Sequence, residues 1–153
     1  MLRTRQRRDA DLAAVVGWIT DREALELFTG TTLCWPLTEE QLRELLAATA
    51  GMTAWTLVDD VEPDRPLGHF DLTRDSEGAH LGRVIIAPER RGEGLGRQLL
   101  GLVLDNARKQ HLTLISLNVA ADNLPAIRTY QHWGFVADEM QLRDEVIAMT
   151  YVE

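Results

Sequence analysis

The segment that most constrains this chain is an apolar run at residues 84–87 that stops at Pro88 and is followed by three closely spaced glycines. An uninterrupted apolar run is typical of a strand that is covered on both faces. From residue 95 onwards, leucines and a valine recur at the spacing of one helix face. The chain is therefore expected to pass from a buried strand into an amphipathic helix through a glycine-rich turn.

The patterns on either side of this turn predict an α+β fold. The expected strands are 52–58, 67–72, 79–87, 112–119, one from Phe135 and one near 145–152. The expected helices are 12–19, 21–28, one after the capping box of Thr38 and Gln41, one after the glycines and one opened by Asn123. The first three strands form a predicted antiparallel meander. Because no repeat or linker interrupts the order, residues 1–153 are interpreted as a single domain.

The bulk properties exclude several classes of function. The net charge of −8 argues against nucleic acid and anionic membranes as partners, because the far field repels a polyanion. No stretch approaches the roughly 20 uncharged apolar residues that span a bilayer. The basic N-terminus lacks a following apolar segment, so we expect a cytoplasmic protein. With one cysteine and no metal-ligand spacing, no metal site is expected.

The glycine-rich turn is suited to binding a phosphate. Residues without Cβ atoms let the backbone turn tightly and approach a ligand. The first N–H groups of the following helix have no partner within the helix, and the positive end of the helix dipole lies among them. The residues that supply these features are Gly92, Gly94 and Gly96, with positive charge from Arg90, Arg91 and Arg97.

Two common phosphate-binding motifs do not match. A P-loop requires Lys followed by Ser or Thr after its last glycine, whereas Arg97 and Gln98 stand here. A dinucleotide-binding turn requires Gly-x-Gly-x-x-Gly, whereas these glycines alternate with single residues. The phosphate ligand is therefore of another kind.

The segment Arg-Gly-Glu-Gly-Leu-Gly at residues 91–96 resembles the Arg/Gln-x-x-Gly-x-Gly/Ala signature of the GNAT N-acetyltransferases. Residues 86–89 look like the strand end that precedes this signature, and residues 123–135 look like the family's second signature, in which an Asn opens a helix and a Tyr precedes Gly-Phe. The resemblance covers residues 52–151 well. It implies a mixed, mostly antiparallel sheet with a splayed strand, flanked by helices.

The resemblance also implies acetyl-CoA as co-substrate. In this family the pantetheine arm runs beside the splayed strand and the signature amides hold the pyrophosphate. By position, the cofactor-binding residues would be Val84, Ile85, Ile86, Arg91, Gly92, Glu93, Gly94, Leu95, Gly96, Arg97, Asn123 and Tyr130. Asn123 could equally be a helix N-cap.

The expected chemistry is attack by a neutral amine on the thioester, with a backbone N–H stabilising the oxyanion. Tyr130 matches the family's Tyr that donates a proton to the coenzyme A sulfur, because a phenol is protonated at neutral pH. The base is open: many relatives carry a carboxylate where this chain has Asn118, and an amide cannot take a proton. His69 and Asp71 are the predicted catalytic candidates, with His80 as a further possibility.

The acceptor is less constrained than the donor. Expected lining residues are the aromatics Trp18, Phe28, Trp35 and Trp55, with the acidic residues Glu23, Glu26 and Asp71 nearby. These carboxylates favour a cationic amine, and the leading hypothesis is acetylation of a primary amine on a small molecule. Acetylation of a protein N-terminus or lysine, and a non-catalytic acyl-CoA sensor, are the alternatives. A homodimer is possible from the family.

Overall fold

The computed structural model describes residues 1–143 and 145–153, which form a seven-stranded sheet in the order β1-β2-β3-β4-β5-β7-β6. The strands are β1 (Leu2–Gln6), β2 (Met52–Asp59), β3 (Gly68–Arg74), β4 (Ala79–Ile86), β5 (Leu114–Ala120), β6 (Val136–Arg143) and β7 (Val146–Val152). The helices are α1 (Leu12–Trp18), α2 (Arg22–Thr29), α3 (Glu39–Ala48), α4 (Leu95–Lys109) and α5 (Leu124–His132). Two short 3-10 turns are present. The turn η1 (Asp9–Asp11) precedes α1, and η2 (Pro88–Arg90) precedes residues 91–94, which are called the glycine loop here.

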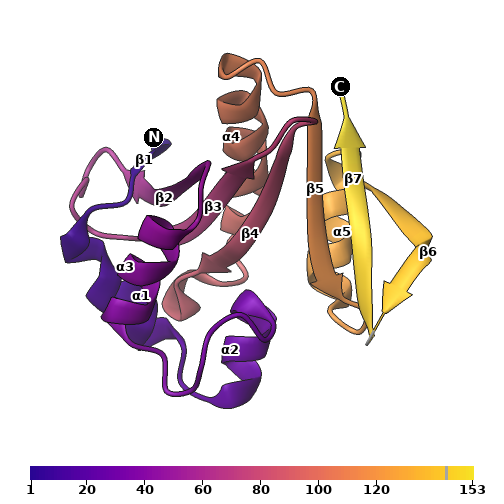
Figure 1. The fold of residues 1–153 in the computed structure, drawn as a ribbon. Helices are drawn as coiled ribbons and strands as arrows, with labels where there is room; N and C mark the ends of the chain where they lie inside the picture. The colour runs from indigo at the N-terminus through magenta and orange to yellow at the C-terminus, as the bar shows by residue number, and fades with distance from the viewer. Residues whose placement is uncertain (144) are drawn as a thin grey trace.

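The sheet is antiparallel except at its centre. β4 and β5 are parallel and pair only from Ala79 with Ile115 to Leu81 with Leu117. Beyond these residues the two strands diverge, which Figure 1 shows as a V-shaped opening that has β1–β4 on one side and β5–β7 on the other. The predicted α+β fold, with a mostly antiparallel sheet and a splayed strand, is confirmed.

Both faces of the sheet are covered, as the apolar run predicted. One core cluster joins α4 to the strands, and Val84 and Ile86 pack against it. A second cluster lies under α1, α2 and α3, and Ile85 packs against that one. The alternation follows from the two-residue period of a strand. Residues 84–86 therefore hold β4 between two layers at the edge of the opening.

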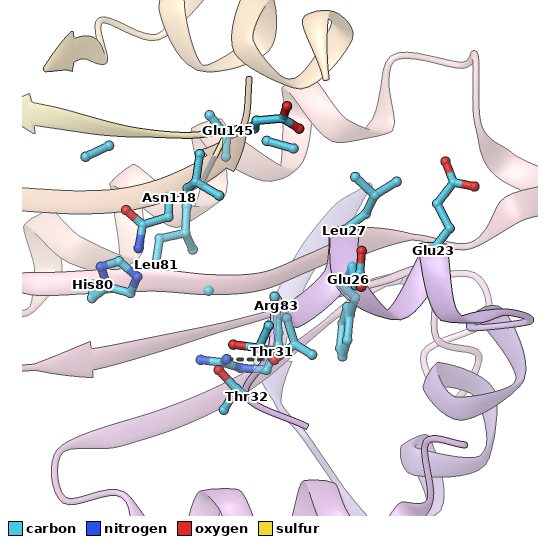
Figure 2. A pocket seen from close by; sticks show the side chains of 18 of the residues that line it. Glu23, Glu26, Leu27, Thr31, Thr32, His80, Leu81, Arg83, Asn118 and Glu145 are labelled. Carbon is cyan, nitrogen blue, oxygen red and sulfur yellow. Dashed lines mark hydrogen bonds between the residues drawn. The ribbon is translucent and has the colours of Figure 1, made fainter. Parts of the chain in front are cut away.

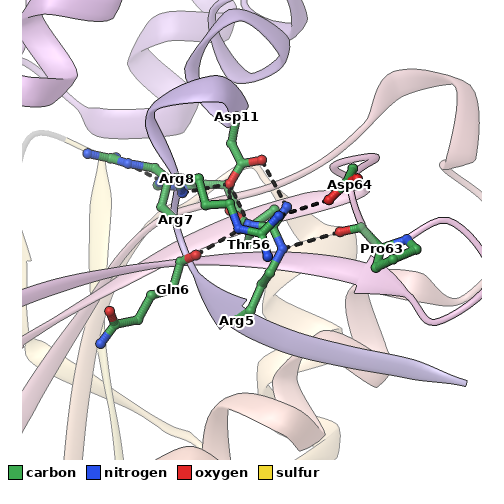
Figure 3. A network of polar contacts seen from close by, with 9 residues as sticks. Arg5, Gln6, Arg7, Arg8, Asp11, Thr56, Pro63 and Asp64 are labelled. Carbon is green, nitrogen blue, oxygen red and sulfur yellow. Dashed lines mark hydrogen bonds and ion pairs between the residues drawn. The ribbon is translucent and has the colours of Figure 1, made fainter.

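The first strand was not predicted from the sequence. β1 carries alternating arginines and pairs with β2, where Arg5 lies opposite Thr56. Arg5 forms a buried, two-pronged ion pair with Asp11, at 2.7 and 3.0 Å, and Thr56 donates a further bond of 2.9 Å to the same carboxylate (Figure 3). Burial acts to raise the Asp11 pKa, but the bonds from Arg5, the Arg8 N–H and Thr56 outweigh it and the pKa is lowered. This network ties the N-terminal strand to η1 and β2.

The helix starts follow the predicted chemistry in part. Thr38 accepts the Gln41 N–H at 3.3 Å, as the capping pattern indicated. Asp21 likewise accepts the Ala24 N–H at 2.7 Å and begins α2 one residue later than the pattern suggested. Among the described residues, no helix has the length and apolar character needed to cross a bilayer.

Candidate active site

Two hollows meet where β4 and β5 separate. The first, called the loop groove here, is about 700 Å³ and runs from the divergence point to the glycine loop and α5. The second, called the α2 cavity, is about 990 Å³ and lies between α2 and the ends of β5 and β7. Both are lined by residues 81–83 of β4 and 118–120 of β5. A ligand in the loop groove can therefore meet one in the α2 cavity at this shared point.

The glycine loop has the open backbone that the sequence predicted. Gly92 and Gly94 have φ of +82° and +79°, a left-handed conformation that side chains rarely adopt. A Cβ built at either position would meet no protein atom within 4 Å, so space remains in front of the loop. Gly94 stands at the N-cap of α4 and offers no side-chain acceptor to its first N–H groups. These donors are left for a ligand.

Most of the predicted cofactor-binding residues line the loop groove, and one does not. Those that line it are Val84, Ile85, Ile86, Arg91, Gly92, Gly94, Leu95, Gly96, Arg97, Asn123 and Tyr130. Glu93 is absent from the lining, and its carboxylate pairs with Arg90 at 3.1 Å. Arg91 donates to the Ile86 carbonyl at 3.3 Å, which joins the loop to the end of β4.

Asn123 and Tyr130 face the groove from α5. Asn123 stands at the N-cap, yet its side chain makes no capping bond, so the amide is free for another partner. Tyr130 is buried, packs edge-on against Phe135 and lines the groove. Burial raises the pKa of Tyr130 to about 12, so its hydroxyl holds its proton at neutral pH.

A β-bulge lies at the shared point. His69 pairs with Ile85 and Asp71 pairs with Gly82. One residue therefore lies between the paired positions on β3, whereas two lie between them on β4. Arg83 takes up the extra residue with φ of +48°, which is uncommon for a side chain of this size. Such backbone strain persists only where surrounding contacts hold it.

His69 and Asp71, the two predicted catalytic candidates, lie behind this bulge and line neither hollow. Both carboxylate oxygens of Asp71 accept bonds from the Arg83 guanidinium. His69 is fully buried, and desolvation lowers its pKa to about 4. The ring nitrogens of His69 and the carboxylate oxygens of Asp71 are hydrogen-bonded to other groups of the protein, so we propose neither residue as the base.

The α2 cavity is acidic, and its lining residues come from both sides of the opening between β4 and β5. Its carboxylates come from α2, from the turn before α5 and from the β6–β7 turn: Glu23, Glu26, Asp122 and Glu145. Figure 2 shows Glu23 and Glu26 on α2 and Glu145 on the other side of the hollow. Among the side chains that the structure describes, the cationic one in the lining is Arg83, which is already paired with Asp71.

His80 is the titratable ring that reaches this cavity. It stands on β4 one residue before the last β4–β5 pair, beside Asn118 in Figure 2. Its Nδ1 lies 3.0 Å from the Ser116 Oγ. Desolvation is the main cause that lowers the His80 pKa from its ordinary value, which favours the neutral ring with a free lone pair at neutral pH.

Some of the residues that line the two hollows could not be predicted from a sequence motif. Among the predicted aromatics, Phe28 lines both hollows, whereas Trp18, Trp35 and Trp55 line neither. Asp122 directly precedes the second signature, so its place near the site could have been predicted from the sequence. Glu145 has no local signal, because a turn between two strands places it there.

The comparisons with known proteins agree with this geometry. The model of the acetyltransferase (GNAT) family matches residues 20–135, which is more than half of the chain. The chain belongs to this family.

Three individual proteins illustrate the likeness. A mycothiol acetyltransferase of Kocuria rhizophila is 34% identical over 84 residues, which cover 51% of this chain and 28% of that relative. The spermidine N-acetyltransferase of Vibrio cholerae, solved with CoA and spermine, gives a TM-score of 0.78 at 22% identity and covers 99% and 95% of the two chains. The PaiA N-acetyltransferase of Thermoplasma acidophilum, solved with coenzyme A, gives 0.76 at 16%, over 100% and 99%. The chain spans well under two thirds of the curated relative's length.

Proposed function

We propose that this chain is an acetyl-CoA-dependent N-acetyltransferase that acts on a primary amine of a cationic small molecule. The observation that carries the proposal is the meeting of the loop groove and the α2 cavity at residues 81–83 and 118–120. One hollow has the glycine loop at its far end, and the described residues that line the other include the carboxylates of Glu23, Glu26, Asp122 and Glu145. A donor and an acceptor bound in them would react at the divergence of β4 and β5.

The groove fits acetyl-CoA part by part. The free N–H groups after Gly94 and the nearby Arg91 and Arg97 suit a pyrophosphate. The edge of β4 from Val84 to Ile86 faces no strand across the opening, so its backbone can bond to an extended pantetheine arm. Bound acetyl-CoA supplies the activated acetyl group.

His80 is the group that can take the proton from the ammonium form of the acceptor. In the tautomer whose Nδ1–H donates to the Ser116 Oγ, Nε2 carries the lone pair and can take the proton directly or through one water. Because its pKa is lowered, the ring stays unprotonated to a pH below its ordinary range. This role compensates for Asn118, whose amide cannot act as a base.

Tyr130 is the group that can supply the final proton. The amine nitrogen forms a bond to the thioester carbon, and the C=O electron pair moves to oxygen. That pair then returns as the C–S bond breaks, the departing thiolate takes the Tyr130 proton, and the positively charged nitrogen of the new amide loses its extra proton to water. Solvent restores the phenol proton, so each turn leaves the protein unchanged.

The charge of the α2 cavity supports a cationic acceptor. Glu23 and Glu26 stand on one wall and Asp122 and Glu145 on the other, so positive groups would meet carboxylates from both sides. Each exposed pair is worth little by itself. Four around one hollow raise the local concentration of cations through their summed field.

The test is a thiol-release assay with acetyl-CoA and three classes of acceptor: small polycationic amines, mono-amines such as ethanolamine, and basic peptides. We expect the polycationic amines to give the highest kcat/KM. Release with peptides alone would assign the chain to protein acetylation. Tight binding of acetyl-CoA without release to any acceptor would assign it to a sensor.

The remaining expectations stay predictions. They are a single domain over residues 1–153, a cytoplasmic location, a homodimer, and the lack of metal, nucleic acid and membrane partners.

A further inference from the structure

The buried ring of His69 bonds to the one peptide group on β4 that the bulge removes from the sheet. Arg83 and Val84 have no Cα partner in the register of the described strands. The Arg83 carbonyl lies instead 2.8 Å from the His69 Nδ1. An imidazole thus replaces the missing strand partner at this position.

The two neighbours of the ring determine its tautomer. A carbonyl oxygen only accepts, so His69 Nδ1 must carry the proton that it shares with Arg83. A guanidinium only donates, so His69 Nε2, 3.1 Å from Arg7 Nη1, must be the acceptor. The ring is therefore neutral, and its single lone pair is occupied by Arg7. Burial agrees with this state, because desolvation lowers the His69 pKa to about 4.

Several elements hold the ring in place. Arg7 also donates to the Leu42 carbonyl of α3 at 3.2 Å. Phe28 of α2 lies with its ring centre 5.8 Å from that of His69. The Arg83 side chain is held by Asp71 and donates to Thr29 at 3.2 Å. The carbonyl and the side chain of Arg83 are both held by these bonds, so the peptide between residues 83 and 84 is fixed in orientation.

The orientation of that peptide determines where its other end points. The C=O of residue 83 and the N–H of residue 84 belong to one planar trans unit and point in opposite directions. Because the carbonyl points at His69, which lines neither hollow, the Val84 N–H points away from His69. Arg83 and Val84 both line the loop groove, so the exposed side of this peptide is the groove side.

We propose that His69 is a positioning residue: its neutral ring donates the Nδ1 proton to the Arg83 carbonyl and thereby turns the Val84 N–H into the loop groove as the donor to the thioester oxygen. This inference rests on the proposed function. A donor fixed in advance stabilises the developing oxyanion without reorganising when charge appears. His69 acts through the backbone and never touches the substrate.

Two substitutions separate the two bonds of the ring. In His69→Asn, the side-chain NH₂ lies near the position of Nδ1 and can keep the bond to the Arg83 carbonyl, while the bond from Arg7 is lost. In His69→Gln, the longer amide can accept from Arg7, but no donor remains near Arg83. Each variant loses one buried bond, so their melting temperatures should fall by similar amounts.

The kinetic results should differ between the two variants. We expect His69→Gln to lower kcat by about 10²-fold, the usual effect of losing one oxyanion donor, with the acetyl-CoA Kd unchanged. His69→Asn should stay close to the unsubstituted protein in kcat. Equal losses in both variants, or full activity in His69→Gln, would overturn the positioning role.

A measurement on the unsubstituted protein keeps the inference testable if a variant fails to fold. Acetyl-CoA labelled with ¹³C at the thioester carbonyl should show a lower C=O stretching frequency when bound than when free, and ¹⁵N NMR should show a downfield shift of the Val84 amide proton. An unshifted stretch or amide in the bound state would overturn it. Failure of acetyl-CoA to bind at all would refute the proposed function instead.

Discussion

The loop groove and the α2 cavity are built in opposite ways. The groove comes mainly from one continuous stretch, β4 and the glycine loop, and its binding groups are backbone N–H donors with arginines around them. The cavity is assembled from α2, β4, β5 and the β6–β7 turn, and its binding groups are exposed carboxylates. A site made of contiguous backbone leaves a motif in the sequence, whereas a site made of distant side chains does not. We therefore expect the proposed donor side to be the part shared with the family, and the proposed acceptor side to be where this chain differs.

The largest effect should come from the loop. Gly94→Val places a branched side chain into the open space in front of the α4 N-terminus and strains a backbone with φ of +79°. We expect acetyl-CoA binding to be lost, with the Kd raised by more than about 10²-fold as measured by calorimetry.

Gly30→Val is the matched control. Gly30 also has a positive φ, +63°, with no atom within 4 Å of a built Cβ, but it lines only the α2 cavity. It should lose a similar amount of stability and keep the Kd for acetyl-CoA. A Kd raised equally in both variants would mean that strain, and not the ligand space, explains the loss.

Tyr130→Phe tests the proposed general acid, which lines the loop groove. Removing the hydroxyl should lower kcat about 10²-fold or more while the Kd for acetyl-CoA stays unchanged, because a general acid acts in the transition state. Tyr151→Phe is the control, since Tyr151 packs on the other side of Phe135 and lines neither hollow. Unchanged turnover in Tyr130→Phe would mean that Tyr130 has only a structural role, packing against Phe135.

His80→Gln should change the pH dependence. A base works only when deprotonated, and the His80 pKa is lowered by burial, so kcat/KM of the unsubstituted protein should fall only at a pH below the ordinary range of a histidine. The variant should lose about 10²-fold near neutral pH and recover partly as pH rises and more acceptor is neutral. An identical pH profile in the two proteins would exclude His80 as the base.

The smallest effect should come from the cavity wall. Glu26→Gln removes one exposed carboxylate and should raise the KM for a polycationic amine about two- to fivefold, with kcat unchanged and the difference reduced by salt. Glu44→Gln, exposed on α3 and outside both hollows, should change nothing. Equal KM values for Glu26→Gln and the unsubstituted protein would remove the charge argument for the acceptor.

Much of the fold was readable from periodicity and turn chemistry. The strands of the meander, α4, α5 and the last strand lie where the patterns placed them. β1 was missed because Arg3 and Arg5 alternate along it, and charged side chains are unusual in strands. The carboxylates that pair with these arginines, Asp60 for Arg3 and Asp11 for Arg5, reach them only in the folded chain.

The catalytic assignments show the same limit. His69 and Asp71 stand two residues apart on a central strand, and this spacing does not reveal that both line neither hollow in the folded chain. His80 was one candidate among several until the β4–β5 pairing placed it beside Ser116. Burial and register, which depend on the whole sheet, are the reasons why we propose His80 and not His69 as the base.

The most direct test of the account is the melting temperature in the presence of acetyl-CoA. Ligand at 100 times its Kd stabilises a protein by about 2.7 kcal/mol, which for a chain of this size corresponds to a rise of roughly 5 to 10 °C. We predict such a rise for the unsubstituted protein and none for Gly94→Val. An unchanged melting temperature at millimolar acetyl-CoA would contradict the assignment of the loop groove.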